Sequence, residues 1–447
     1  MIAAAVWRRS TEKGTFMIEE KGDLEEVIEK YQNLIAENPH SPEHHKELGN
    51  AFHRSGAYDL ALEEYRTCLH IDPNYYPAQY NMGNTYFAMD ECQLAVIAWQ
   101  RALIAHPKLE HAVYNIAYTY FKQGMLERRS EEARRRYLDD ALMEFLKASR
   151  MRPQNKDTLL HIGLTWYELD HYDNAIKAYQ EVLKIDPEDQ DAHYNLGNVY
   201  YEKGMEDPIF FEKAIAQYRR ALQCNPSDMK SHNNIADCLL RLGQVDKAKS
   251  EIDKVLKVDP NYAPAICTLS ELHSHEGCHQ EAIAGFKRIV ALDPEKNHVL
   301  HKYASQKLIE EYTRLLKTSI DRTEVRFELG LAYKDLGIAY HDRVLIGKAR
   351  DEFRKALEIG PAQVEFHIEL AECYLKLNNT DLALMEAEAA LAMSPDSVQG
   401  HCLLGEIYVQ VGDRELAQLE FNAIRRIVSS PGGQAHPYDQ DEPDLEG

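Results

Sequence analysis

Asparagine and tyrosine residues recur along the first half of this 447-residue chain at spacings suited to binding a peptide. Asn50 and Asn84 stand 34 residues apart, as do Asn81 and Asn115. A carboxamide offers both a hydrogen-bond donor and an acceptor, so a row of them can pair with the amides of an extended peptide. Flanking tyrosine rings can cover its apolar side chains. The candidate peptide-binding residues are Asn50, Tyr80, Asn81, Asn84, Tyr114, Asn115, Tyr194, Asn195, Asn198 and Asn234.

The sequence contains no pattern that indicates catalysis or a cofactor. It has no Gly-rich phosphate loop and no Gly-flanked serine nucleophile. Five possible ligands of a soft metal lie close together, namely Cys267, His273, His275, Cys278 and His279. Their spacing fits no zinc motif, so we interpret them as a core histidine and a histidine-rich turn. We therefore predict that the protein is not an enzyme and holds neither a cofactor nor a metal.

Helical hairpins must position the asparagines. Residues 42–75 contain two apolar-periodic runs, with Gly56 between them and Pro73 after the second. One hairpin cannot bury its own apolar face, and the pattern recurs eleven times. When the repeat is numbered from Pro42 as position 1, position 8 holds a small residue, as in Gly49, Gly83, Gly163 and Gly197, and position 20 holds alanine. Position 15 tolerates the positive φ of a helix-ending turn, with eight glycines from Gly22 to Gly412 and with Asp90, Asp170 and Asn378.

In period and in residue identity, these positions resemble the tetratricopeptide repeat (TPR) family over residues 8–431. The resemblance implies an all-α fold, a right-handed α-solenoid of helix-turn-helix repeats. In this family the first helices line a concave groove, which implies that the candidate asparagines face it. The superhelical arms of the O-linked N-acetylglucosamine transferase and of kinesin light chains look similar in this respect. Asn-Leu-Gly-Asn at 195–198 is also the family consensus, so a purely structural role is the alternative.

One segment interrupts the repeats. After Ala304 the apolar residues continue at helical spacing with no turn residue, which predicts one irregular long helix without a partner. The predicted organisation is an N-terminal lobe of about eight repeats at 1–296 with a degenerate first repeat, the unpaired helix at 297–322, a C-terminal lobe of three repeats at 323–431, and a disordered acidic tail at 432–447. Three repeats carry insertions between their helices, around residues 125–137, 206–210 and 340–346.

The charge balance narrows the classes of partner. With 73 acidic against 51 basic residues, the formal net charge is −22, which disfavours binding to nucleic acid or to an anionic membrane. No apolar run reaches membrane-spanning length, so we predict no direct membrane insertion. The N-terminus does not resemble a secretory signal, and the eight cysteines share no common spacing. Both features favour reduced thiols and a cytoplasmic location.

Three charged regions remain as secondary candidates. In the C-terminal lobe the groove positions are mostly acidic, which favours either a basic partner or a solvated face; they are Glu324, Glu328, Glu365, Glu369, Glu372 and Glu406, with Asp335 and Lys376. The insertion at 125–137 holds five arginines with glutamates at i,i+4 spacing, which indicates a self-paired helical extension or, alternatively, an anionic docking patch. Lys46 with Asn50 and Asn81 resembles part of a dicarboxylate clamp, but His111 and Asn115 replace the cationic pair, so we predict no clamp.

The sequence therefore predicts a non-catalytic protein–protein interaction scaffold or adaptor that binds an extended partner segment in the concave groove. The alternative is a regulatory or substrate-recruiting subunit of an enzyme or chaperone complex. Because the amides are expected at the surface, we expect single Asn→Ala changes to weaken binding mildly. Replacing Asn115, Asn195 and Asn234 together should abolish binding without lowering thermal stability.

Overall fold

The computed structural model describes residues 21–292, 298–318, 323–360 and 363–429. These residues form 22 α-helices, α2 to α23, and none of them belongs to a strand. The first helix of the degenerate repeat and the predicted acidic tail at 432–447 lie outside the described residues. None of the described helices combines the length and the apolar character that crossing a bilayer requires.

The chain divides into two compact units, Met1–Glu251 and Ile252–Gly447. The helices of the first unit are α2 (Lys21–Glu37), α3 (Pro42–Arg54), α4 (Tyr58–Ile71), α5 (Tyr76–Ala88), α6 (Cys92–Ala105), α7 (Glu110–Leu126), α8 (Glu131–Met151), α9 (Lys156–Glu168), α10 (Tyr172–Ile185), α11 (Gln190–Gly204), α12 (Ile209–Cys224) and α13 (Met229–Arg241). Helix α14 (Val245–Val258) spans the boundary. The second unit holds α15 (Ala263–His275), α16 (His279–Ala291), α17 (His298–Thr318), α18 (Thr323–Ala339), α19 (Arg343–Ile359), α20 (Val364–Lys376), α21 (Thr380–Met393), α22 (Val398–Val411) and α23 (Arg414–Ser429).

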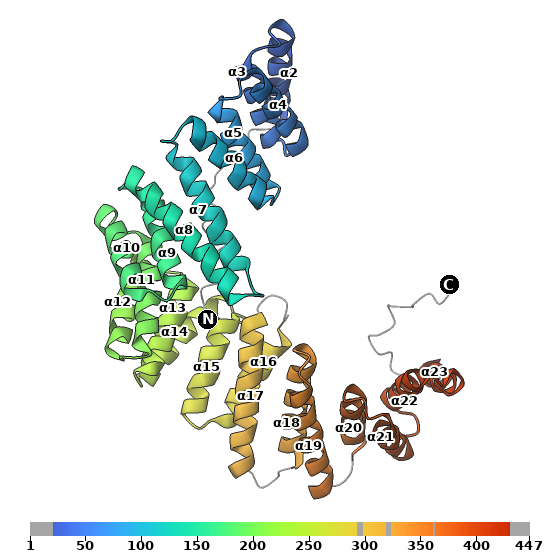
Figure 1. Cartoon of the computed structure of the whole chain (residues 1–447). Coiled ribbons are helices and arrows are strands. Elements are labelled where there is room, and N and C mark those ends of the chain that lie inside the picture. The colour runs from blue at the N-terminus through green and yellow to red at the C-terminus, as the bar shows by residue number, and fades with distance from the viewer. Residues whose placement is uncertain (1–20, 293–297, 319–322, 361–362, 430–447) are drawn as a thin grey trace. The chain divides into compact units, whose positions relative to one another are not determined.

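Within the first unit, consecutive helices pair as antiparallel hairpins, α3 with α4, α5 with α6 and so on (Figure 1). In four of these hairpins, α3–α4, α5–α6, α9–α10 and α11–α12, an aromatic ring of the second helix lies directly on a glycine of the first helix. A Cβ atom built on Gly83 would come within 2.4 Å of the Trp99 ring, and one on Gly49 within 2.6 Å of the Tyr65 ring. The small residue at position 8 thus lets a large buried ring fill the space between the helices. This packing confirms the helix-turn-helix solenoid that the repeats predict.

The turns within the hairpins follow the predicted pattern, except where a repeat carries an insertion. Regular repeats have positive φ at Gly56, Asp90, Asp170, Gly243, Gly277, Asn378 and Gly412. In the three repeats with insertions, the expected turn residues are helical instead: Gly124 and Gly337 lie inside helices, and Gly204 is the last residue of α11. At each of them the missing side chain admits a residue of the second helix. For example, a Cβ on Gly204 would lie 2.6 Å from Phe211.

The arginine-rich insertion lengthens the hairpin α7–α8 rather than forming a separate element. Helix α7 has 17 residues and α8 has 21, against 13 and 14 in α5 and α6. None of the predicted i,i+4 pairs forms in the described part of the chain, because α8 begins only at Glu131 and Arg134 takes that carboxylate. Arg134 also contacts Glu168 of α9, with 2.6 Å between Nη2 and Oε2. The insertion therefore packs on the next repeat.

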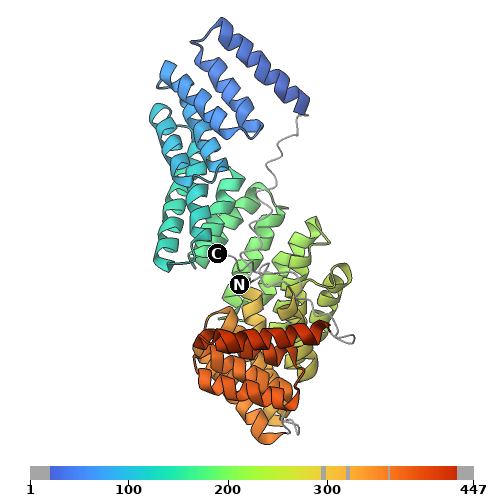
Figure 2. The same cartoon turned by 90° about the vertical axis from the view of Figure 1, so that its right-hand side faces the viewer.

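In the second unit, the single 21-residue helix α17 interrupts the hairpins between α15–α16 and α18–α19, as the sequence predicts. The carboxylate of Glu311 on α17 is 1% exposed and binds Ser274, His279 and Arg314 at 2.6–2.7 Å. His279 is thus tied to a carboxylate, and the described residues hold no group of three or more His, Cys, Asp or Glu placed to bind a metal. Figure 2 shows the last helix of this unit, α23, in dark red beside the orange-red helices before it.

The boundary between the two compact units falls after Glu251 in the sequence, whereas the lobes predicted from the sequence are 1–296 and 323–431. The division into those two lobes stays a prediction.

Candidate functional site

All ten candidate residues lie in the first unit, on the first helices of its hairpins. Three of the asparagines act as hubs, because the Oδ1 atom of each accepts two hydrogen bonds. One bond comes from an aromatic side chain of the second helix of the same repeat, and the other comes from an asparagine of the next repeat. We call these arrangements the 50–81, 84–115 and 198–234 triads. Asn50 binds Tyr65 (2.8 Å) and Asn81 (2.6 Å), Asn84 binds Trp99 (3.1 Å) and Asn115 (3.2 Å), and Asn198 binds Tyr218 (2.8 Å) and Asn234 (3.2 Å).

The triads have a structural role of their own. A carboxamide oxygen has two lone pairs, and each hub uses both, one within its hairpin and one across to the next. Buried polar groups that lose such partners destabilise a protein by about 1–3 kcal/mol. Asn195 and Asn234 are only 4% and 3% exposed. The hydrogen bonds of Asn234 argue against the expectation that it can be replaced without loss of stability.

The three predicted tyrosines also have partners. Tyr80 and Tyr194 accept hydrogen bonds from Asn115 and Asn234, both at 3.3 Å. The Tyr114 ring packs edge-on against Phe145, with 5.6 Å between ring centroids. Burial raises the pKa of Tyr80. These rings support the stack of first helices as well as bordering its surface.

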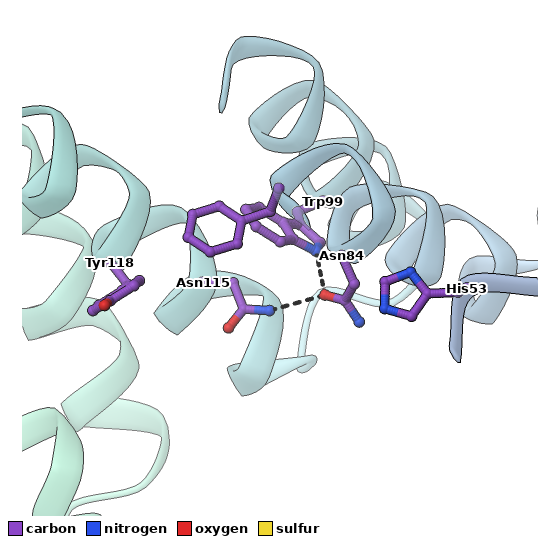
Figure 3. Close-up of a pocket in the computed structure, with 6 residues that line it drawn as sticks. His53, Asn84, Trp99, Asn115 and Tyr118 are labelled. Atoms are coloured by element: carbon purple, nitrogen blue, oxygen red, sulfur yellow. Dashed lines mark hydrogen bonds between the residues drawn. The ribbon is translucent and has the colours of Figure 1, made fainter. Parts of the chain in front are cut away.

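The 84–115 triad borders a pocket of about 270 Å³ (Figure 3). The pocket is lined by His53 of α3, Asn84 and Phe87 of α5, Trp99 of α6, and Asn115 and Tyr118 of α7. The ten candidates from the sequence are asparagines and tyrosines, and they do not include His53, Phe87, Trp99 or Tyr118 of this pocket. His53 and Tyr118 occupy positions of their repeats that face the groove in this family. Considering every residue at those positions, whatever its type, would have identified both.

Polar atoms at this pocket are left without partners. In Figure 3, Asn84 lies between Asn115 and His53, and its Oδ1 takes the bonds from Trp99 and Asn115. The Asn84 Nδ2 group carries two protons, and among the described residues only the Tyr80 hydroxyl can accept one of them. Oδ1 of Asn115 has no donor among these residues. The neighbouring amides therefore present one donor and one acceptor beside an aromatic surface.

Some of the ionic candidates are paired with charged neighbours. Lys46 contacts Glu43, with 2.6 Å between Nζ and Oε1, and also Glu47, so its charge is already paired within α3. In the second unit, the buried Lys334 bridges Glu369 and Glu372, with 2.7 Å to the latter. Burial is the main cause that raises the pKa of Glu369. A basic partner at this acidic face stays a prediction.

Comparisons with known proteins agree with the repeat pattern. A family model described as TPR repeat matches residues 49–90 and 163–204, and models described as Tetratricopeptide repeat match 211–269 and 335–398. The DnaJ homolog subfamily C member 7 homolog of Schizosaccharomyces pombe is 23% identical over 231 residues, which are 48% of this chain and 48% of the relative. Superkiller protein 3 of the same organism is 22% identical over 245 residues, 53% of this chain and 17% of the relative.

This chain thus spans about half the length of the first of these relatives and a smaller part of the second. The crystal structure of YrrB, a TPR protein with an unusual peptide-binding site, is 20% identical to the part it matches. Its TM-score is 0.38, over 46% of this chain and 96% of that one. The recurring repeat positions, the packing of aromatic rings on glycines and the matching family models agree. This chain belongs to the tetratricopeptide repeat family.

Proposed function

We propose that the protein is a non-catalytic interaction scaffold that binds an extended segment of a partner protein across the first helices of its first unit. The proposed centre of binding is the pair Asn84 and Asn115. The observation that carries the proposal is the unused donor on Asn84 beside the unused acceptor on Asn115, next to an aromatic pocket.

The order of free polar atoms supports an extended segment. Oδ1 of Asn81 has no donor among the described residues, so successive triads offer an acceptor at Asn81, a donor at Asn84 and an acceptor at Asn115. An extended backbone likewise presents N–H and C=O groups in alternation. Each such bond contributes only about 1 kcal/mol net, so measurable affinity needs several bonds and contact with the rings. The mostly uncharged contacts predict weak dependence on salt.

The chain's place in the cell and in an assembly belongs to the same proposal. All eight cysteines are free, which is consistent with a cytoplasmic location. The net charge of −22 favours a protein partner over nucleic acid. A regulatory or substrate-recruiting subunit of an enzyme or chaperone complex would use the same face. A stoichiometric enzyme that co-purifies with the chain would favour that second function.

Peptide selection tests the proposal without knowledge of the natural partner. A random peptide library displayed on phage is panned against the full chain, and the affinity of the enriched peptides is measured by calorimetry. Asn115→Ala should weaken binding several-fold. The matched change Asn234→Ala, in the 198–234 triad, should leave the affinity unchanged when it is measured below the melting temperature of that variant. Enriched peptides that bind the Asn115→Ala variant as tightly as the wild type would refute this site.

A further inference from the structure

We propose that the pocket beside Asn84 and Asn115 selects a tyrosine side chain of the bound segment. This inference rests on the proposed function, because the tyrosine arrives as part of that segment. Three observations carry it: the rings that line the pocket, the proton arrangement around His53, and the positive charge of Lys122 nearby.

The lining favours an aromatic guest. The Phe87 ring lies 5.9 Å from the Trp99 ring and 6.0 Å from the Tyr118 ring, measured between centroids. Aromatic rings attract one another at centroid separations of about 4.5–7 Å. A further ring placed against this group would continue the same packing, whereas a short aliphatic side chain would leave most of the aromatic surface in water.

The hydrogen bonds around His53 fix which of its ring nitrogens carries the proton. The Thr85 hydroxyl donates its single proton to the backbone oxygen of Asn81 at 2.9 Å. His53 Nδ1 lies 2.9 Å from the same hydroxyl oxygen, so we assign Nδ1 as the donor in that bond. In the neutral ring Nε2 therefore has a free lone pair. Burial, followed by the charge of Arg54, lowers the pKa of His53 and favours this neutral form.

A hydroxyl group fits the two polar atoms that remain. Nδ2 of Asn84 can only donate, and Nε2 of His53 can only accept. A phenol hydroxyl can accept from Asn84 and donate to His53 at once, whereas phenylalanine can do neither. A carboxylate or phosphate has no proton for His53 when it is fully ionised.

Lys122 disfavours a cationic guest. Its Nζ lies 4.9 Å from the centroid of the Phe87 ring and 2.6 Å from Oδ1 of Asp90. The ammonium group thus already occupies the attractive position over that ring. Of the natural side chains, tyrosine combines the aromatic ring, the neutral charge and the hydroxyl.

Capped amino acids test this selectivity on the full chain. The probes are N-acetyl-L-tyrosinamide, its phenylalanine analogue and its phosphotyrosine analogue, and the signal is the indole N–H resonance of Trp99, assigned with a Trp99→Phe variant. The tyrosine probe should shift this resonance at a concentration about fivefold lower than the phenylalanine probe, as expected for one net hydrogen bond. The phosphotyrosine probe should not shift it.

Two variants make the result specific. His53→Phe keeps a ring but removes the Nε2 acceptor, so the preference for the tyrosine probe should fall to the part that the Asn84 donor supplies. Tyr201→Phe, a change beside the 198–234 triad at the position equivalent to Phe87, should alter nothing. Equal affinity of the two neutral probes for the wild type, or a preference that His53→Phe leaves undiminished in a variant with unchanged melting temperature, would overturn the tyrosine assignment.

The two proposals fail in different ways. If the tyrosine probe leaves the Trp99 signal unmoved while selected peptides still lose affinity through Asn115→Ala, the tyrosine pocket is wrong and the peptide site stands. If the selected peptides are indifferent to Asn115→Ala, the peptide site is wrong and the pocket loses its basis.

Discussion

The 84–115 and 198–234 triads have the same hydrogen-bond skeleton and differ in what surrounds it. Both join an asparagine hub to a buried aromatic side chain and to the asparagine of the next repeat. At the 198–234 triad, Tyr201 donates a hydrogen bond to Asp237 at 2.5 Å. The equivalent residues of the 84–115 triad are Phe87 and Tyr118, which make a ring contact only and leave a pocket.

This difference separates stacking from binding. The amide network links consecutive repeats wherever it occurs, so an asparagine in this position is evidence of packing. Access to the amides depends on the residues that correspond to Phe87 and Tyr118 in each triad. In this account, therefore, binding is centred on the 84–115 triad and the adjoining Asn81, although the asparagine ladder extends along the first unit.

The largest expected effect is one that the two triads share. Trp99→Ala and Tyr218→Ala should each lower the free energy of unfolding of the first unit by about 3–5 kcal/mol, because each residue is 1% exposed and fills the space over a glycine. Tyr218→Phe, which removes only the hydroxyl, should cost about 1 kcal/mol. Urea unfolding measures all three. A much smaller loss at Trp99 would show that the open triad is not an integral part of the core.

Truncation of the second asparagine should separate the triads. Asn234 is 3% exposed, so Asn234→Ala should cost about 1–3 kcal/mol. Asn115 is half-buried and water can replace its bonds, so Asn115→Ala should cost less than about 1 kcal/mol. Thermal and urea unfolding of the pair of variants gives the comparison. Equal losses would mean that the two sites are closed to the same degree.

Exchange of the surrounding residues should close the open site. The double variant Phe87→Tyr/Tyr118→Asp places the Tyr201–Asp237 hydrogen bond beside the 84–115 triad. We expect selected peptides to lose about tenfold in affinity, equivalent to about 1.4 kcal/mol, with little change in stability. Calorimetry and melting curves check both parts. Retained affinity in the folded double variant would show that the pocket does not take part in binding.

The smallest effect concerns pH. The pKa of His53 is lowered by burial and by Arg54, so the ring stays neutral down to a pH below its ordinary value of about 6.5. Binding of the tyrosine probe should be constant between about pH 8 and pH 7 and should weaken only below about pH 6.5, when Nε2 gains a proton and ceases to accept. His53→Phe should remove this dependence. A titration that weakens above neutral pH would assign the effect to another group.

The sequence predicts the repeats, the helices and the helix faces because each follows from spacing along the chain. It does not predict that Asn84 and Asn115 bond to each other, because that contact joins two repeats and depends on their separation. It also predicts a turn at Gly124, where an insertion lets α7 continue. The ion pair of His45 with Glu64, at 2.6 Å, recurs at His232 and His401, and only the structure reveals it. Contacts of this kind need positions in space, not only positions in a repeat.

Photo-crosslinking of a selected peptide to the full chain tests the central claim most directly. The peptide carries a benzophenone group next to its most strongly selected residue, and the crosslinked segments are identified by mass spectrometry. The account predicts crosslinks to helices α5 and α7, and their loss in the Phe87→Tyr/Tyr118→Asp variant. Crosslinks concentrated on α11 and α13, or on the second helices of the hairpins, would contradict it.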